Sequence, residues 1–291
     1  MSALINENTN VLVAGITGKS GALQTRVMKE YGTKIVAGVT PGKGGQELDG
    51  IPVYDLVQEA ALEHRIDAAI SFVPAKAVKD SAFEIIDSGI KFLVLTMEEI
   101  PSQDVIEILN YADAHGTRIL GPGTAGLIAP GKCKLGAHPP MMYMEGDVSI
   151  VSKSGALSYE IGKSLTEAGI GQSTVMALGG GPLWGMTQRD AIALFQEDPQ
   201  TKVIVLLGEI GGTMEEDAAD FIAEHVTKPV VSMIVGRAAP EGKSLGHAGA
   251  IVQGNKGTAQ SKIAKLKEAG VQVGRTPQEM VEIIRKIRGD N

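Results

Sequence analysis

The sequence predicts an α/β protein with a doubly wound parallel sheet in each half of the chain. Short apolar runs alternate with helical patterns over most of the 291 residues, and such alternation implies right-handed crossovers between parallel strands. This length suits about two domains. The periodicity is lost between residues 121 and 146, where glycine and proline accumulate. We therefore expect domains at residues 1–122 and 147–291, joined by a linker at 123–146.

Strands and helices alternate in both halves. In the first half, strands are expected at 11–14, 34–39, 67–72, 92–95 and 118–120, and helices up to about 31 and at 57–64, 77–88 and 102–115. In the second half, strands are expected at 148–151, 173–177, 203–207, 229–235 and 271–273, and helices from 155, at 188–196 and 214–225, from 258 and at 277–287. Loops that leave the carboxyl ends of such strands form the site in open α/β sheets.

The composition narrows the classes of function. A net charge of -7 opposes binding to a nucleic acid backbone, and only 4% of the residues have aromatic rings that could stack on bases. Cys133 is the only cysteine, which excludes an intrachain disulfide and fits a reducing cytosol. The polar N-terminus and the lack of a long apolar run predict neither a signal peptide nor a membrane span. We expect a cytoplasmic protein that binds no nucleic acid, no membrane and no metal of its own.

A glycine-rich turn follows the first strand, with Gly15, Gly18 and Gly21 at intervals of three. A P-loop is rejected because the first glycine of that motif would fall at Val13, inside the strand. Thr17 breaks the G-x-G-x-x-G pattern of a nicotinamide dinucleotide site. The amides at residues 18–20 open a helix and can hold a phosphate, with a tight turn that binds no ligand as the alternative.

The turn after the second strand indicates the type of nucleotide. Dinucleotide enzymes place an acid there for the ribose hydroxyls, whereas this chain has Lys43 on a glycine-rich turn. A cation suits a phosphorylated ribose, so we expect a nucleotide that has a pyrophosphate and a ribose phosphate, which describes both coenzyme A and NADP. Thr96, Met97 and Glu98 leave the fourth strand at the same edge and are expected to line this pocket, next to a helix start at Pro101.

The loop at residues 236–251 leaves a buried strand and has His247 between Gly246 and Gly249. Its small neighbours leave the imidazole uncovered for a ligand, and the alternative is a structural histidine. Glu209 ends another strand at the same edge. Its carboxylate can accept the N–H of one ring nitrogen and leave the other nitrogen as a nucleophile.

A helix start lies at the same edge of the second half. Ser154 and Gly155 leave backbone amides that suit an anion, with ordinary N-capping by Ser154 as the alternative. The histidine, the carboxylate and this helix start favour a phosphorylated histidine, because phosphoryl transfer needs positioning and neutralised charge. The chain has no motif for magnesium and a nucleotide. The phosphoryl donor is therefore expected on another polypeptide.

Six stretches of the sequence resemble the alpha subunits of succinyl-CoA synthetase, a family of NDP-forming acid–CoA ligases, and the similarity runs nearly end to end. They are Gly15–Gly18, Tyr31–Lys34, Val39–Gly45, Ser152–Gly155, Gly208–Gly212 and Gly246–Ala250. The resemblance implies a Rossmann-like coenzyme A-binding domain followed by a flavodoxin-like ligase domain. It also implies an enzyme that joins a carboxylic acid to coenzyme A with ATP or GTP, through an acyl phosphate and a phosphohistidine.

The resemblance also implies roles for single residues. His247 matches the phosphorylated residue and Glu209 its carboxylate partner. Ser154 and Gly155 match the phosphate cradle, and Tyr159 matches a residue at the substrate and the subunit boundary. The coenzyme A contacts match Thr17, Gly18, Lys19, Ser20, Lys43, Thr96, Met97 and Glu98. A beta subunit of ATP-grasp type would carry the nucleotide and Mg²⁺, in a heterodimer or heterotetramer.

Three stretches depart from the family pattern. Residues 96–101 replace Ile-Thr-Glu-Gly-Ile-Pro, residues 179–185 replace Gly-Gly-Asp-Pro-Ile-Pro-Gly, and residues 121–126 are closer to ATP-citrate lyase. The resemblance implies succinate as the acid, and these departures keep malate, citrate, itaconate and a branched acid as alternatives. An NADP-dependent oxidoreductase and a non-catalytic coenzyme A-binding regulatory module are the hypotheses from other classes.

Overall fold

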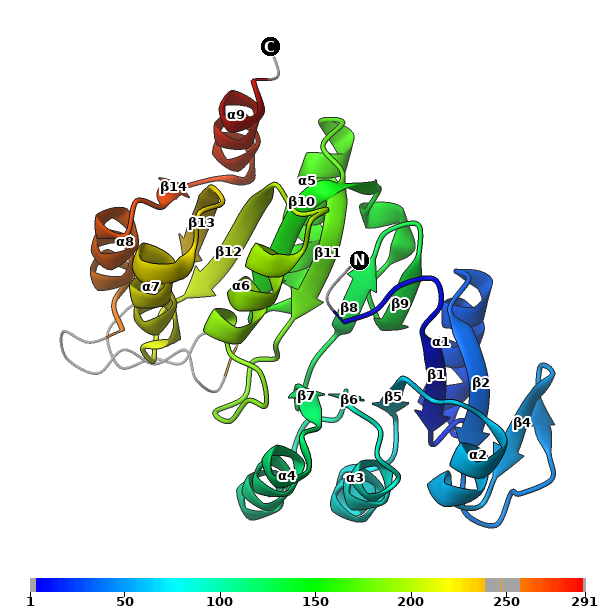
Figure 1. Ribbon diagram of the computed structural model, residues 1–291. Helices are drawn as coiled ribbons and strands as arrows, with labels where there is room; N and C mark the ends of the chain where they lie inside the picture. Colours follow the sequence, from blue (N-terminus) through cyan, green and yellow to red (C-terminus); the bar gives the residue numbers. More distant parts are fainter. Residues whose placement is uncertain (1–3, 239–246, 248–256, 290–291) are drawn as a thin grey trace.

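The computed structural model describes residues 4–238, 247 and 257–289, and it contains two seven-stranded sheets (Figure 1). The first sheet has the strand order β3-β4-β2-β1-β5-β6-β7. Its strands are β1 (Asn10–Ala14), β2 (Lys34–Val39), β3 (Glu47–Leu48), β4 (Ile51–Tyr54), β5 (Ala68–Ser71), β6 (Phe92–Leu95) and β7 (Arg118–Leu120). Its helices are α1 (Lys19–Glu30), α2 (Val57–Glu63), η1 (Ala75–Ala77), α3 (Val78–Asp87) and α4 (Ser102–His115).

The six parallel strands of this sheet have the order of a Rossmann fold. β1 pairs in parallel with β2 on one side and with β5 on the other, so the direction of winding reverses at β1. Ligands of doubly wound sheets bind at such a reversal, beyond the carboxyl ends of the strands. The turn at Gly15–Gly18, which follows β1, lies at that point.

The second sheet has the order β14-β13-β12-β10-β11-β8-β9. Its strands are β8 (Gly126–Ala129), β9 (Cys133–Gly136), β10 (Glu145–Ser152), β11 (Gln172–Ala177), β12 (Val203–Glu209), β13 (Val230–Val235) and β14 (Gln272–Gly274). Its helices are η2 (Pro140–Met142), α5 (Gly155–Glu167), α6 (Gln188–Glu197), α7 (Met214–His225), α8 (Ala259–Glu268) and α9 (Pro277–Arg288).

The parallel strands of the second sheet have the flavodoxin-like order, which reverses between β10 and β12. Ser152 ends β10 and Glu209 ends β12, so the two loops that follow flank this second reversal point. These strands are buried on both faces, which explains why they appear in the sequence as short continuous apolar runs. The expectation of two doubly wound α/β units is confirmed.

The stretch at residues 123–146, expected to be a linker, contains β8 and β9, which pair in antiparallel fashion and extend the second sheet. Its glycines serve close backbone approach, because a Cβ on Gly126 would lie 1.9 Å from the Leu135 carbonyl oxygen. They have positive φ values, +89° at Gly126 and +111° at Gly136. Glycine-rich composition therefore indicates tightly packed strands here, where turns and loops of a linker were expected.

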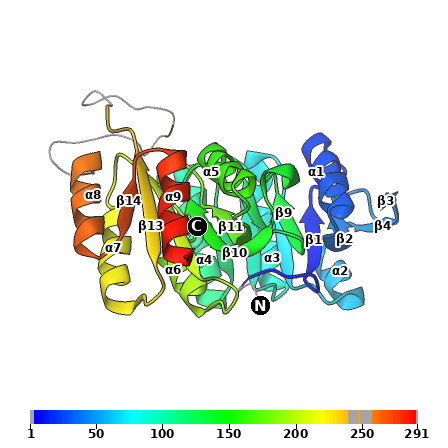
Figure 2. The same cartoon turned by 90° about the horizontal axis from the view of Figure 1, so that it is seen from above.

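β9 also joins the two domains. Thr33, which precedes β2, donates its hydroxyl to the Lys134 carbonyl at 2.8 Å and accepts the Lys134 N–H at 3.0 Å. β9 lies next to α1 in both views of the molecule (Figures 1 and 2). In the described ranges 4–238 and 257–289, no helix is both long and apolar enough to span a bilayer.

Candidate active site

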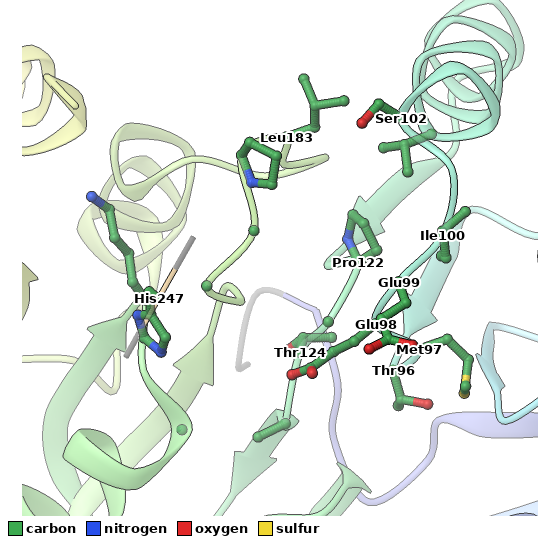
Figure 3. Close-up of a pocket in the computed structure, with 18 residues that line it drawn as sticks. Thr96, Met97, Glu98, Glu99, Ile100, Ser102, Pro122, Thr124, Leu183 and His247 are labelled. Atoms are coloured by element: carbon green, nitrogen blue, oxygen red, sulfur yellow. The ribbon is translucent and has the colours of Figure 1, made fainter. Parts of the chain in front are cut away.

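Loops from both sheets enclose a cavity of about 710 Å³. Figure 3 shows His247 on one wall and Thr96, Met97 and Glu98 on the opposite wall. The cavity is lined by Thr96, Met97, Glu98, Glu99, Ile100, Ser102, Val105, Pro122, Gly123, Thr124, Ala125, Lys153, Gly155, Gly180, Gly181, Pro182, Leu183 and His247. Residues expected to contact the nucleotide and the histidine expected to carry phosphate therefore face one space, although they come from different domains.

His247 and Glu209 form a close pair. The Nδ1 atom of the imidazole lies 2.8 Å from Oε2 of Glu209, and the Glu209 side chain is 12% exposed. The hydrogen bond to Glu209 raises the pKa of His247, although burial opposes this effect. A carboxylate on Nδ1 fixes the proton there in the neutral ring, which makes Nε2 the nucleophilic nitrogen.

The loop at residues 179–185 packs against the imidazole. A Cβ on Gly180 would lie 2.5 Å from Cδ2 of His247, so this backbone approaches the ring more closely than any side chain allows. The indole N–H of Trp184 donates to the Gly179 carbonyl at 2.9 Å and closes the loop. The tryptophan that departs from the family pattern thus holds the loop in contact with His247.

The start of α5 forms another part of the cavity wall. Gly155 lines the cavity, and the Ser154 hydroxyl accepts the Leu157 N–H at 3.4 Å as an N-cap. The Tyr159 ring lies one turn further along, outside the cavity lining, with its hydroxyl 3.2 Å from where a Gly155 Cβ would be. Burial raises the pKa of Tyr159, so its hydroxyl stays protonated. The Ser154 hydroxyl thus caps α5, and Gly155 lines the cavity at the start of this helix.

The glycine turn after β1 lies outside this cavity, and so does the turn at Lys43. Gly15 has a φ of +76°, and a Cβ on Gly21 would lie 2.1 Å from the Gly15 carbonyl oxygen. The N-cap residue of α1 is Gly18, which has no side chain to accept a hydrogen bond from the first amides of the helix. A helix start without a side-chain cap leaves amide donors for phosphate, so the residues at this turn fit coenzyme A.

Lys43 lies on an exposed turn. The Asp55 carboxylate oxygen Oδ1 accepts the backbone N–H groups of Lys43 and Gly44 at 2.9 and 2.8 Å, which leaves the Lys43 side chain to face solvent. An exposed cation suits a ligand phosphate that also remains close to solvent. Thr17 is tied to the same region, because its N–H donates to the Thr40 hydroxyl at 3.4 Å.

One cationic residue of the cavity was not singled out from the sequence. Lys153 lines the cavity but is only 4% exposed, and it forms an ion pair with the fully buried Glu215. A lysine between two serines at a helix start appears as a solvated side chain in the sequence. Its burial depends on α7, which lies about sixty residues further along the chain.

Comparison with known proteins assigns both domains. Residues 6–98 match the family model of the CoA binding domain, and residues 151–272 match that of the CoA-ligase. The chain is 47% identical to the alpha 1 subunit of the ADP-forming succinate–CoA ligase from Archaeoglobus fulgidus, over 99% of this chain and 98% of that protein. It is 45% identical to the alpha subunit from Aquifex aeolicus, over 99% of this chain and 95% of the relative.

Among solved structures, the chain is similar to an ATP citrate lyase from Methanosaeta concilii in complex with (3S)-citryl-CoA. The TM-score is 0.88 at 25% sequence identity, over 98% of this chain and 50% of the citrate lyase chain. The chain thus spans about half the length of that protein. With the two domain matches and the near full-length identity to ligase subunits, this chain belongs to the family of succinate–CoA ligase alpha subunits.

Proposed function

We propose that the chain is the alpha subunit of an NDP-forming acid–CoA ligase whose acid is succinate. The observation that carries this proposal is the shared cavity, in which His247, paired with Glu209, faces the coenzyme A-binding loop at Thr96–Glu98. A thiol held by the first domain and a phosphoryl group on the imidazole can then meet the same acid. Thr17, Gly18, Lys19, Ser20 and Lys43 bind the nucleotide end of coenzyme A, and Tyr159 contacts the substrate at the subunit boundary.

The chemistry follows from the two ring nitrogens. Glu209 accepts a hydrogen bond from the Nδ1–H group, which leaves the lone pair on Nε2. This lone pair attacks the terminal phosphorus of ATP or GTP, so that a P–N bond forms as the bond to the nucleoside diphosphate breaks. A carboxylate oxygen of the acid then takes the phosphoryl group from His247. The thiol sulfur attacks the acyl carbon of this acyl phosphate, a C–S bond forms as the C–O bond breaks, and phosphate leaves with the thiol proton. Ser154 and Gly155, at the start of α5, hold the phosphoryl group at the amino end of this helix.

The partner is a beta subunit of ATP-grasp type that binds the nucleotide and Mg²⁺. We propose a cytoplasmic heterodimer or heterotetramer. We propose residues 1–122 as the coenzyme A-binding unit and residues 147–291 as the ligase unit, whose sheet is extended by β8 and β9 of the stretch between them.

The test is reconstitution with a beta subunit of ATP-grasp type. Acyl-CoA formation is measured with ATP or GTP and succinate, malate, citrate, itaconate or a branched acid. We expect turnover that requires coenzyme A, a nucleoside triphosphate and both subunits, with succinate the best acid. Calorimetry that gave tight binding of NADPH and weak binding of coenzyme A would overturn the proposal. Binding of coenzyme A without turnover of any acid would instead favour a regulatory module.

A further inference from the structure

A buried charge network borders the cavity that His247 lines. The Lys153 ammonium is 3.0 Å from Oε1 and 3.3 Å from Oε2 of Glu215, whose side chain is fully buried. The Lys262 ammonium, also fully buried, contacts Oε2 of the same carboxylate. One carboxylate therefore binds two cations that are far apart in the sequence, Lys153 before α5 and Lys262 in α8.

The two lysines differ in their surroundings. Lys262 also donates to the Gly211 carbonyl at 2.8 Å and lies 3.7 Å from the Glu216 carboxylate. Lys153 lines the active-site cavity, and its ammonium lies 5.8 Å from the centre of the Trp184 ring. Because Glu215 is shared with Lys262, its single negative charge offsets the positive charge at Lys153 only in part.

The same network reaches the residue that orients the histidine. Oε1 of Glu215 accepts the backbone N–H of Glu209 at 3.2 Å. Gly208 makes room for this contact, because a Cβ there would lie 2.6 Å from Cγ of Glu215. The Glu215 carboxylate thus holds the backbone of Glu209, the residue paired with His247. The same carboxylate also fixes the position of the Lys153 ammonium.

We propose that Lys153 binds the phosphoryl group during its transfer to and from His247, and that Glu215, held by Lys262, positions it. This inference rests on the proposed ligase function. Phosphoryl transfer moves a strongly anionic group onto a ring whose Nδ1 side already faces the Glu209 carboxylate. A buried cation on the same cavity offsets that concentration of negative charge without reorganisation of solvent.

The first test compares Lys153→Met with Lys153→Arg. The methionine variant is expected to fold, because Glu215 keeps Lys262 as its partner and no buried charge loses its last counterion. With the beta subunit and labelled ATP, single-turnover formation of phosphohistidine should slow about 100-fold in Lys153→Met, the usual effect of losing one preorganised donor. Lys153→Arg keeps the charge and should recover most of the rate.

The second test uses Lys262→Met, which removes a cation that does not touch the cavity. Glu215 then pairs with Lys153 alone and neutralises it more fully, so phosphohistidine formation should slow about 10-fold, between wild type and Lys153→Met. Affinity for coenzyme A should stay unchanged in all three variants, because its proposed contacts lie in the first domain.

The pKa of His247 distinguishes an electrostatic role of Lys153 from a purely structural one. Among the described residues, the charged groups that act on the imidazole are Glu209 at the end of β12, Lys153 after β10 and Glu98 after β6; both acids favour the imidazolium and Lys153 opposes it. NMR titration of His247 should therefore give a higher pKa in Lys153→Met than in wild type. A wild-type rate or an unchanged pKa in that variant would overturn the role of Lys153, whereas a wild-type protein that takes no phosphate would reject the ligase function itself.

Discussion

The two domains use the same strand–turn–helix device in opposite ways. In the first domain, α1 starts at Gly18 without a side-chain cap, and the nearby cation of Lys43 is exposed. In the second domain, α5 starts at Ser154 with a side-chain cap, and the nearby cation of Lys153 is 4% exposed and ion-paired. One helix start is open to solvent, and the other is built into a buried network.

This difference indicates a division between binding and chemistry. Exposed cations attract phosphate weakly and are screened by salt, so several of them together suit a nucleotide that must bind and leave. Buried groups act in a lower dielectric and keep their geometry, which suits a step in which charge moves between atoms. Substitutions in the second domain should therefore affect the reaction more than substitutions in the first.

The largest effect is expected from His247→Asn. This substitution removes the nucleophile, and formation of an acid-labile, base-stable phosphoprotein with labelled ATP and the beta subunit should fall by at least about 1000-fold. Coenzyme A should bind with wild-type affinity, as measured by calorimetry. Retained labelling would show that another residue carries the phosphate and would contradict the proposed division between the domains.

Glu209→Gln should have the next largest effect. The hydrogen bond that His247 donates to Glu209 is the main cause of the raised pKa of His247, so the variant should show a lower pKa in an NMR titration. Loss of the carboxylate also removes the fixed tautomer, and phosphohistidine formation should slow by about 100- to 10,000-fold.

The rate of phosphohistidine formation should also depend on pH differently in wild type and Glu209→Gln. Neutral imidazole is the nucleophile, so the wild-type rate should fall as the pH drops through the raised pKa, and in Glu209→Gln this fall should begin at a lower pH. The Glu209–imidazolium pair stabilises the fold at pH values below the ordinary pKa of histidine, and this stabilisation is lost as the pH rises through the raised pKa. An unchanged pH profile in Glu209→Gln would contradict the pairing.

Lys43→Ala tests the first domain and should have a moderate effect. Loss of one exposed phosphate contact should weaken coenzyme A binding about 10-fold at low salt, and less at high salt because exposed charges are screened. The matched control is Lys34→Ala, an exposed lysine at the opposite end of β2, which should leave the affinity unchanged. Phosphohistidine formation should be normal in both variants, and a slower rate in Lys43→Ala would show that the two regions are not separate.

The smallest effect concerns Glu99, which lines the cavity with a φ of +61°. Its position has glycine in the family pattern, and the left-handed region costs a non-glycine residue about 1 kcal/mol or more. Glu99→Gly should relieve this strain and raise the free energy of unfolding by about 0.5 kcal/mol after the entropy cost of glycine. Glu99→Ala is the control and should give no gain. Thermal unfolding that ranked alanine above glycine would contradict the strain.

Much of the fold could be predicted because the parallel strands are continuous apolar runs. The helix expected at 214–225 has those bounds in α7 (Met214–His225), and β2 and β6 likewise match. The hairpin of β3 and β4 was missed because it is short, contains Pro52 and lies beside glycine-rich turns. β8 and β9 were missed for a similar reason, since glycines required by close backbone approach appear as loop residues.

The site could be predicted in part. His247 and Glu209 each leave a strand at the same sheet edge, and topology alone places such residues near each other. The network of Lys153, Glu215 and Lys262 could not be predicted, because it depends on the relative register of three helices and a strand end. The sequence feature that relates to this network is Gly208, near the end of a buried strand. A larger side chain there would displace the Glu215 carboxylate.

The central claim is that the second domain carries phosphate on the ring nitrogen opposite Glu209, while the first domain holds the thiol carrier. The most direct measurement is phosphorus and nitrogen NMR of the wild-type chain after phosphorylation by ATP and the beta subunit. With Nδ1 held 2.8 Å from Glu209, the phosphate is expected on Nε2 of His247. Phosphate on Nδ1, or on any other residue, would contradict the account.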